Sequence, residues 1–135
     1  MKNSVEIEVD LAAQVDEELT RLFPSRKIQR VLLIAPPDVD GRLFSYDSAK
    51  RGRCYNYPMY GAGVVATWLR NSGIDVQLLN LNHEILKACH ESQSINDFDF
   101  DDIWETHLLD SVERFQPDFI GLTCIMLFLG DTLDH

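Results

Sequence analysis

The residues best suited to contact a ligand are small, cyclic or hydroxyl-bearing, and they flank short apolar segments. Residues 30–35 form one such segment and residues 118–125 a second. Runs of this kind are typical of strands covered on both faces of a parallel sheet. Because open α/β sheets bind ligands at the carboxyl ends of their strands, the flanking residues predict a binding site. The candidate ligand contacts at these positions are Pro36, Pro37, Tyr57, Pro58, Gly61, Gly63, Thr123, Cys124, Ile125 and Met126.

Each of these residues also has a purely structural interpretation. Proline has no N–H, so the Pro36-Pro37 pair can simply end a strand. Gly61 and Gly63 can serve close packing of a helix on a strand instead of the approach of a ligand. Thr123 is a residue type common at strand ends. Cys124 fits a small core residue better than a nucleophile, because no basic partner lies near it in the sequence.

Titratable side chains form no recognisable catalytic or metal-binding motif. The three cysteines are far apart and lack the spacing of metal ligands. His83 follows a predicted strand on the ligand side, but a capping or solvent-facing role is favoured there, and His90 and His107 are weaker candidates. The acidic residues between 97 and 102 lack the glycine and final glutamate of a calcium loop, so they predict the start of a helix.

The connection over residues 36–58 is far longer than the usual ~4–6 residues, which is typical of functional or mobile loops. It carries a basic cluster, residues 50–53, that stands out in an acidic chain. The cluster predicts either a contact with a phosphate or carboxylate, or a solvated loop tip. Aromatic residues of the same connection offer apolar surface to a flat ligand or a partner domain; they are Phe44, Tyr46, Tyr55 and Tyr57.

Hydrophobic periodicity predicts the elements that position these residues. An amphipathic helix over residues 10–23, ended by Pro24, is expected to pack on the sheet or on a neighbouring domain. The other expected elements are strand 30–35, a helix from residue 60 that ends at 71–73, strand 74–81, a helical turn over 83–91, a helix over 101–115 and strand 118–125. Right-handed crossovers then give an α/β fold, a doubly wound parallel sheet in the order 2-1-3.

Composition narrows the class of protein. The 135 residues, 45% of them apolar, allow one globular domain, which we divide into a lead-in over 1–27 and an α/β domain over 28–135. A net charge of −10 argues against nucleic acid and membrane as partners. No apolar run is long enough to cross a bilayer, and the N-terminus is too polar for a signal peptide. The scattered cysteines favour a reducing, cytoplasmic location.

The predicted sheet looks incomplete. Doubly wound sheets usually have about five strands, whereas this sequence ends shortly after the third. We therefore expect a piece of a longer protein, truncated after its third strand. The open edge of that strand carries no lysine or proline, so a homo-oligomer formed through this edge is also predicted.

Short motifs in a consistent order make the chain similar to the N-terminal cobalamin (B12)-binding domain of class B radical S-adenosylmethionine enzymes. The resemblance covers residues 28–127, most of the chain. The motifs that carry it are Ala35-Pro36-Pro37, Tyr57-Pro58, Gly61 and Gly63, Leu69-Arg70-Asn71-Ser72-Gly73, the segment 75–80, and Pro117 to Thr123.

The resemblance implies a flavodoxin-like (Rossmann-like) fold that holds the corrin ring over the strand ends. It implies that the candidate ligand contacts from Pro36 to Met126 named above are cofactor-binding residues. Thr123-Cys124-Ile125 would stand beside the dimethylbenzimidazole tail, where many cobalamin domains carry Ser-x-Leu. Residues 37–41 contain no histidine, so the resemblance implies a base-off cobalamin without a protein histidine ligand. An iron–sulfur cluster and S-adenosylmethionine would belong to a downstream radical S-adenosylmethionine domain, because the cysteine motif that holds the cluster is absent here.

Two functions therefore follow from the sequence. The first is a cobalamin-binding module of a methyltransferase or cyclase type of radical enzyme, not catalytic alone. The alternative is a cofactor-free flavodoxin-like or receiver-like protein-interaction module. The receiver version lacks the acceptor aspartate, since Thr123 and Cys124 end the third strand. A flavin would need a phosphate loop rich in serine, threonine and glycine where Pro36 and Pro37 stand.

Overall fold

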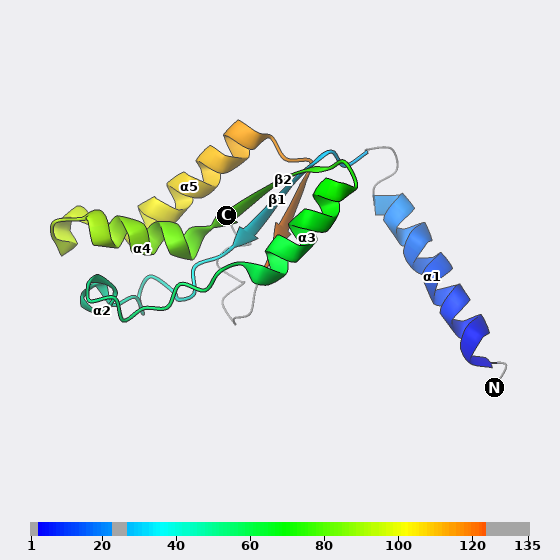
Figure 1. The fold of residues 1–135 in the computed structure, drawn as a ribbon, viewed down its shortest axis with the longest axis horizontal. Coiled ribbons are helices and arrows are strands. Elements are labelled where there is room, and N and C mark those ends of the chain that lie inside the picture. The colour runs from blue at the N-terminus through cyan, green and yellow to red at the C-terminus, as the bar shows by residue number, and fades with distance from the viewer. Residues whose placement is uncertain (1–2, 23–26, 124–135) are drawn as a thin grey trace.

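The computed structural model describes residues 3–22 and 27–123 of the chain (Figure 1). The elements in chain order are α1 (Asn3–Leu22), β1 (Arg30–Ala35), α2 (Tyr46–Lys50), α3 (Tyr60–Asn71), β2 (Asp75–Asn80), α4 (Leu81–Glu91), the 3-10 turn η1 (Ile95–Asp97), α5 (Phe100–Phe115) and β3 (Phe119–Leu122). Helices and strands alternate from β1 onward, as the hydrophobic pattern predicts.

The three strands form one parallel sheet in the order β2-β1-β3. Val31 of β1 stands opposite Val76 of β2 and opposite Phe119 of β3, which fixes the register on both sides. Each strand-to-strand connection contains helix, as parallel pairing requires. The predicted α/β fold, doubly wound and flavodoxin-like with the order 2-1-3, is confirmed for the described residues.

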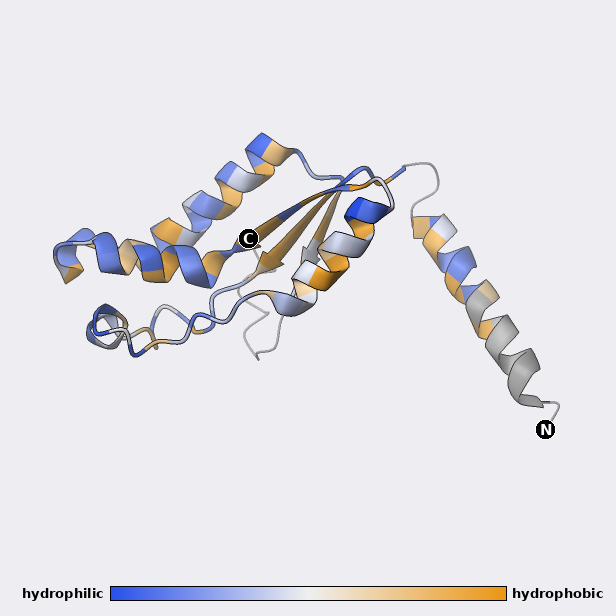
Figure 2. Ribbon diagram, viewed as in Figure 1, coloured by the Kyte–Doolittle hydropathy of each residue, from blue (hydrophilic) through white to orange (hydrophobic). Residues whose placement is uncertain are grey.

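Helices cover both faces of the sheet, and β1 feeds both cores (Figure 1). On one face α3 packs over Val31 and Leu33; on the other, α4 and α5 pack over Leu32 and Ile34. All four of these side chains are buried. Because successive side chains of β1 point to opposite, covered faces, the strand is apolar without interruption from Val31 to Ala35, and most of it is orange in Figure 2. Arg30, at its start, is exposed.

Helix ends are set by local chemistry that the sequence shows. The side chain of Asp99 caps α5 by accepting from the N–H groups of Asp101 and Asp102, so the acidic run opens a helix as predicted. Gly73 follows α3 with a φ of +83°, a conformation that favours glycine at a helix end. The helix from residue 60, the strand near 74–81 and the helix near 101–115 are all confirmed.

Several predicted bounds are wrong. The connection 36–58 contains the five-residue helix α2, which is stabilised by the buried Ala49. The expected helical turn over 83–91 is the eleven-residue helix α4, which begins directly after β2 because Asn80 caps it. β3 spans Phe119–Leu122, and the last predicted strand residues lie outside the described residues.

Helix α1 begins earlier than the predicted residue 10, and it lies apart from the sheet (Figure 1). The apolar side chains of Leu11, Val15, Leu19 and Leu22 are all more than half exposed. The expected packing of this helix on the sheet is therefore wrong for this structure, and packing on a neighbouring domain stays a prediction.

None of the described helices is long and apolar enough to span a membrane.

Candidate functional site

The carboxyl ends of all three strands meet at one edge of the sheet, where the predicted site residues gather. Pro36 and Pro37 follow β1 and are half-buried. Thr123 follows β3, and both its N–H (2.8 Å) and its Oγ1 (3.3 Å) donate to the carbonyl of Ile34. The structure thus brings Thr123 next to the end of β1, but its hydroxyl already serves the sheet. Cys124, Ile125 and Met126 lie outside the described residues.

A second group of polar side chains stands at the end of β2. Nδ2 of Asn82 donates to the carbonyl of Tyr55 at 3.2 Å, and its Oδ1 accepts the N–H of Asp38 at 3.3 Å. Asn80 caps α4 through the N–H of His83, and its Nδ2 donates to the carbonyl of Tyr57 at 3.4 Å. These bonds hold both ends of the connection 36–58 against the end of β2.

The remaining contact in this group joins two side chains. Nδ1 of His83 lies 2.7 Å from Nδ2 of Asn56. His83 is exposed, as predicted, but it contacts a loop asparagine instead of only solvent. The sequence reasoning did not single out Asn56, Asn80 or Asn82; the available signal was a run of polar residues directly after a buried strand.

Tyr55 and Tyr57 present aromatic surface beside these contacts. Their rings stack with centroids 5.6 Å apart and an interplanar angle of 19°. The two side chains are 73% and 64% exposed. Each ring leaves an apolar face in water, so the stacked pair presents a small aromatic surface at this edge.

The other aromatic residues of the connection are used in packing. Phe44 lies 5.3 Å from Phe98 and 5.1 Å from Phe100, and Tyr46 lies 5.5 Å from Phe98, between ring centroids. Of the four aromatic residues predicted to offer surface, only Tyr55 and Tyr57 therefore remain available to a ligand.

The basic cluster divides in the same way. Nζ of Lys50 donates to the carbonyls of Cys89 (3.0 Å), His90 (2.8 Å) and Ser92, so it closes the C-terminus of α4. Arg51 and Arg53 are exposed. Lys50 therefore has a structural role, the capping of α4. For Arg51 and Arg53 both predictions stay open: a contact with a phosphate or carboxylate, or a solvated loop tip.

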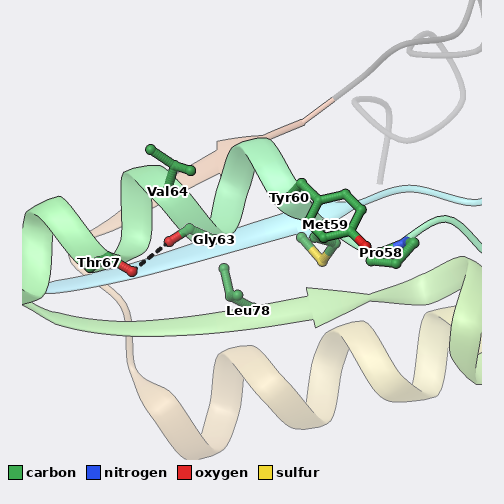
Figure 3. Close-up of a pocket in the computed structure, with 7 residues that line it drawn as sticks. All are labelled: Pro58, Met59, Tyr60, Gly63, Val64, Thr67 and Leu78. Carbon is green, nitrogen blue, oxygen red and sulfur yellow. Dashed lines mark hydrogen bonds between the residues drawn. The ribbon is translucent and has the colours of Figure 1, made fainter.

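An open, mostly apolar groove of about 440 Å³ runs between α3 and β2 (Figure 3). It unites Pro58 and Gly63 of the predicted site, while Pro36, Pro37 and Thr123 do not line it. In the groove, Oγ1 of Thr67 donates to the carbonyl of Gly63 at 2.8 Å. The full lining comprises Pro58, Met59, Tyr60, Gly63, Val64, Thr67 and Leu78.

Gly61 and Gly63 lie in the first turns of α3, at the strand-end edge. Apart from its chain neighbours and the backbone of α3 itself, a Cβ built on either residue would meet no atom of the described residues within 4 Å. Close packing of α3 on a strand among the described residues therefore does not account for either glycine. By contrast, a Cβ on Gly121 would come within 2.8 Å of Leu33 Cδ2, so that glycine does serve packing.

Electrostatics at this edge are modest. Burial raises the pKa of the Asp38 carboxyl, which follows the proline pair. Burial also raises the pKa of the Cys89 thiol, although Lys50 opposes this. His107 Nε2 lies 3.7 Å from Glu84 Oε2 and links α5 to α4. The described residues hold no cluster of three or more His, Cys, Asp or Glu that could bind a bare metal ion.

The strand-end edge offers polar side chains that hold the connection 36–58 in place, and apolar surface that a ligand could contact. Among the residues that the structure describes there, Asn80, Asn82 and His83 contact the connection 36–58, and no titratable groups are paired as nucleophile and base. Comparison of the chain with protein-family models, with curated proteins and with solved structures finds no match.

Proposed function

We propose that this chain is a cobalamin-binding module that holds the corrin ring over the carboxyl ends of its strands. The observation that carries the proposal is the pair Gly61 and Gly63, which face open space at the strand-end edge of a parallel sheet. Glycine inside a helix costs about 1 kcal/mol relative to alanine. No contact among the described residues accounts for that cost, which supports the close approach of a ligand at these two glycines.

The residues present fit this ligand. A corrin brings its own four cobalt ligands, so the protein needs apolar and small groups more than a metal-binding cluster. Pro58, Met59 and Leu78 supply apolar surface next to the glycines. The segment after β1, residues 37–41, contains no histidine, which supports a base-off cobalamin without a protein histidine ligand.

Bound cobalamin would supply methyl-carrier or radical chemistry, and this chain would orient it and exclude water from one face. The parent enzyme would be a methyltransferase or cyclase of the radical S-adenosylmethionine type. Its iron–sulfur cluster and S-adenosylmethionine would be held by a partner domain downstream in the same chain. A cytoplasmic location belongs to the same proposal, since the free cysteines Cys54 and Cys89 suit a reducing compartment.

A protein-interaction module is the second candidate, and an exposed stripe of α3 that borders the groove favours it. Tyr60, Val64 and Trp68 recur every four residues, and they are 77%, 72% and 73% exposed. Such a stripe is typical of a helix that packs on another protein surface. It does not require a cofactor, so the two candidates differ in one measurable property, the retention of a corrin.

Mixing the full chain with hydroxocobalamin and then removing free ligand by gel filtration tests the proposal. We expect the corrin absorption band to elute with the protein. Elution of all corrin in the small-molecule fraction would contradict cobalamin binding and leave the interaction module.

A further inference from the structure

Three side chains at the end of β2 hold three successive residues of the long connection. Asn82 binds the carbonyl of Tyr55, His83 contacts the side chain of Asn56, and Asn80 binds the carbonyl of Tyr57. The Asn82 side chain is only 8% exposed. A buried amide with both its atoms hydrogen-bonded fixes its partners in place, because breaking either bond leaves a buried polar group unsatisfied.

The segment held in this way displays flat apolar surface. The rings of Tyr55 and Tyr57 lie stacked and mostly exposed, although the backbone beneath them is anchored. An anchored aromatic pair loses little conformational entropy when a ligand binds, so it binds more tightly than the same residues on a loose loop. Packing among the described residues does not account for this exposure.

We propose that Tyr55 and Tyr57 form a preorganised stacking surface for a flat, conjugated ligand, and that Asn80, Asn82 and His83 are its positioning residues. This inference rests on the proposed function and deepens it, since the corrin or its benzimidazole tail is the planar group concerned. The two tyrosines are the specificity-determining residues, because a ring face prefers another π system to an aliphatic surface.

The test is the affinity of the full chain for hydroxocobalamin, measured by equilibrium dialysis with absorbance detection. Tyr55→Leu and Tyr57→Leu should each weaken binding about 3- to 10-fold, the loss that follows from removing one aromatic stacking partner. Tyr55→Phe should bind like the wild type, because the ring is kept. Asn82→Ala should also weaken binding, since the tyrosine backbone is released.

Controls separate this role from stability. Leu43→Ala removes an exposed apolar side chain (67%) from the same connection and should leave the affinity unchanged. The melting temperature of Tyr55→Leu should match the wild type, because the ring is exposed. The tyrosine variants therefore still test the stacking surface if Asn82→Ala does not fold. If the wild type binds corrin and both tyrosine-to-leucine variants bind it equally well, the stacking surface is refuted while the proposed function stands. If the wild type binds none, both fall.

Discussion

Asn82 and Tyr55 lie 27 residues apart in the chain, yet the side-chain amide of the first donates to the carbonyl of the second at 3.2 Å. The same amide accepts the N–H of Asp38 at 3.3 Å. One buried residue thus joins the start and the end of the connection 36–58 to the strand-end edge, and the geometry of the candidate site depends on it.

Asn82→Ala should lower the free energy of unfolding by about 1–3 kcal/mol, because it removes the partner of two part-buried groups, the Tyr55 carbonyl and the Asp38 N–H. Urea denaturation followed by circular dichroism measures this. Asn96→Ala, at an exposed asparagine in η1, is the matched control and should change stability little. Equal stability of the Asn82 variant and the wild type would show that the connection is held by other contacts.

Gly61→Ala should raise stability by about 0.5–1 kcal/mol, because alanine favours the helix and its methyl group meets open space. Gly61→Leu and Gly63→Leu should in turn weaken hydroxocobalamin binding, since the larger side chain occupies the approach of the ring. Thermal denaturation and equilibrium dialysis measure the two effects. Leucine variants that retain corrin fully would remove the glycines from the site.

The sequence predicts the three strands and the longer helices of the sheet well, because these elements depend on local patterns of apolar residues. Residues 31–35 are apolar throughout because β1 lies between two helical layers. The pattern of α5 is a simple amphipathic repeat with an aspartate cap. Such signals need no knowledge of distant residues.

Elements held by distant contacts could not be predicted in the same way. Helix α2 has five residues and depends on Ala49 in a core with Leu86 and Cys89, and on the bond between Tyr46 and Ser92. For the candidate site, the sequence indicates the strand ends but not the anchoring role of Asn82, because its two partners are far from it in sequence. A pair of glycines looks alike in sequence whether it faces a strand or open space.

Asp38→Asn should stabilise the protein at neutral pH. Burial raises the pKa of Asp38 above its ordinary value of 3.8, so the folded state binds the proton more tightly than the unfolded state. The contribution of protonated Asp38 to the free energy of unfolding is fully present below pH 3.8, and it is lost as the pH rises through the raised pKa. The gain from the substitution should therefore shrink on acidification; urea denaturation at several pH values measures it, with the exposed Asp75→Asn as control. A gain independent of pH would contradict this account.

Self-association through β3 is expected, because among the described residues this strand pairs with β1 alone. Phe119 and Ile120 are 37% and 45% exposed along it, and unprotected strand edges recruit other strands. Light scattering over a dilution series should show a mass that grows with concentration. Ile120→Lys should suppress this growth, while Leu109→Lys on α5 adds the same charge elsewhere and should not. A monodisperse monomer at high concentration would contradict an open edge.

The central claim, a base-off cobalamin held without a protein histidine, is tested most directly by electron paramagnetic resonance of the chain mixed with stoichiometric cob(II)alamin. Free cob(II)alamin keeps its benzimidazole nitrogen on cobalt and shows nitrogen superhyperfine splitting. We predict a spectrum without that splitting, because binding at the strand ends removes the base and no imidazole replaces it. A spectrum that retains the nitrogen splitting would contradict the account, whether it arises from unbound cofactor or from a histidine ligand.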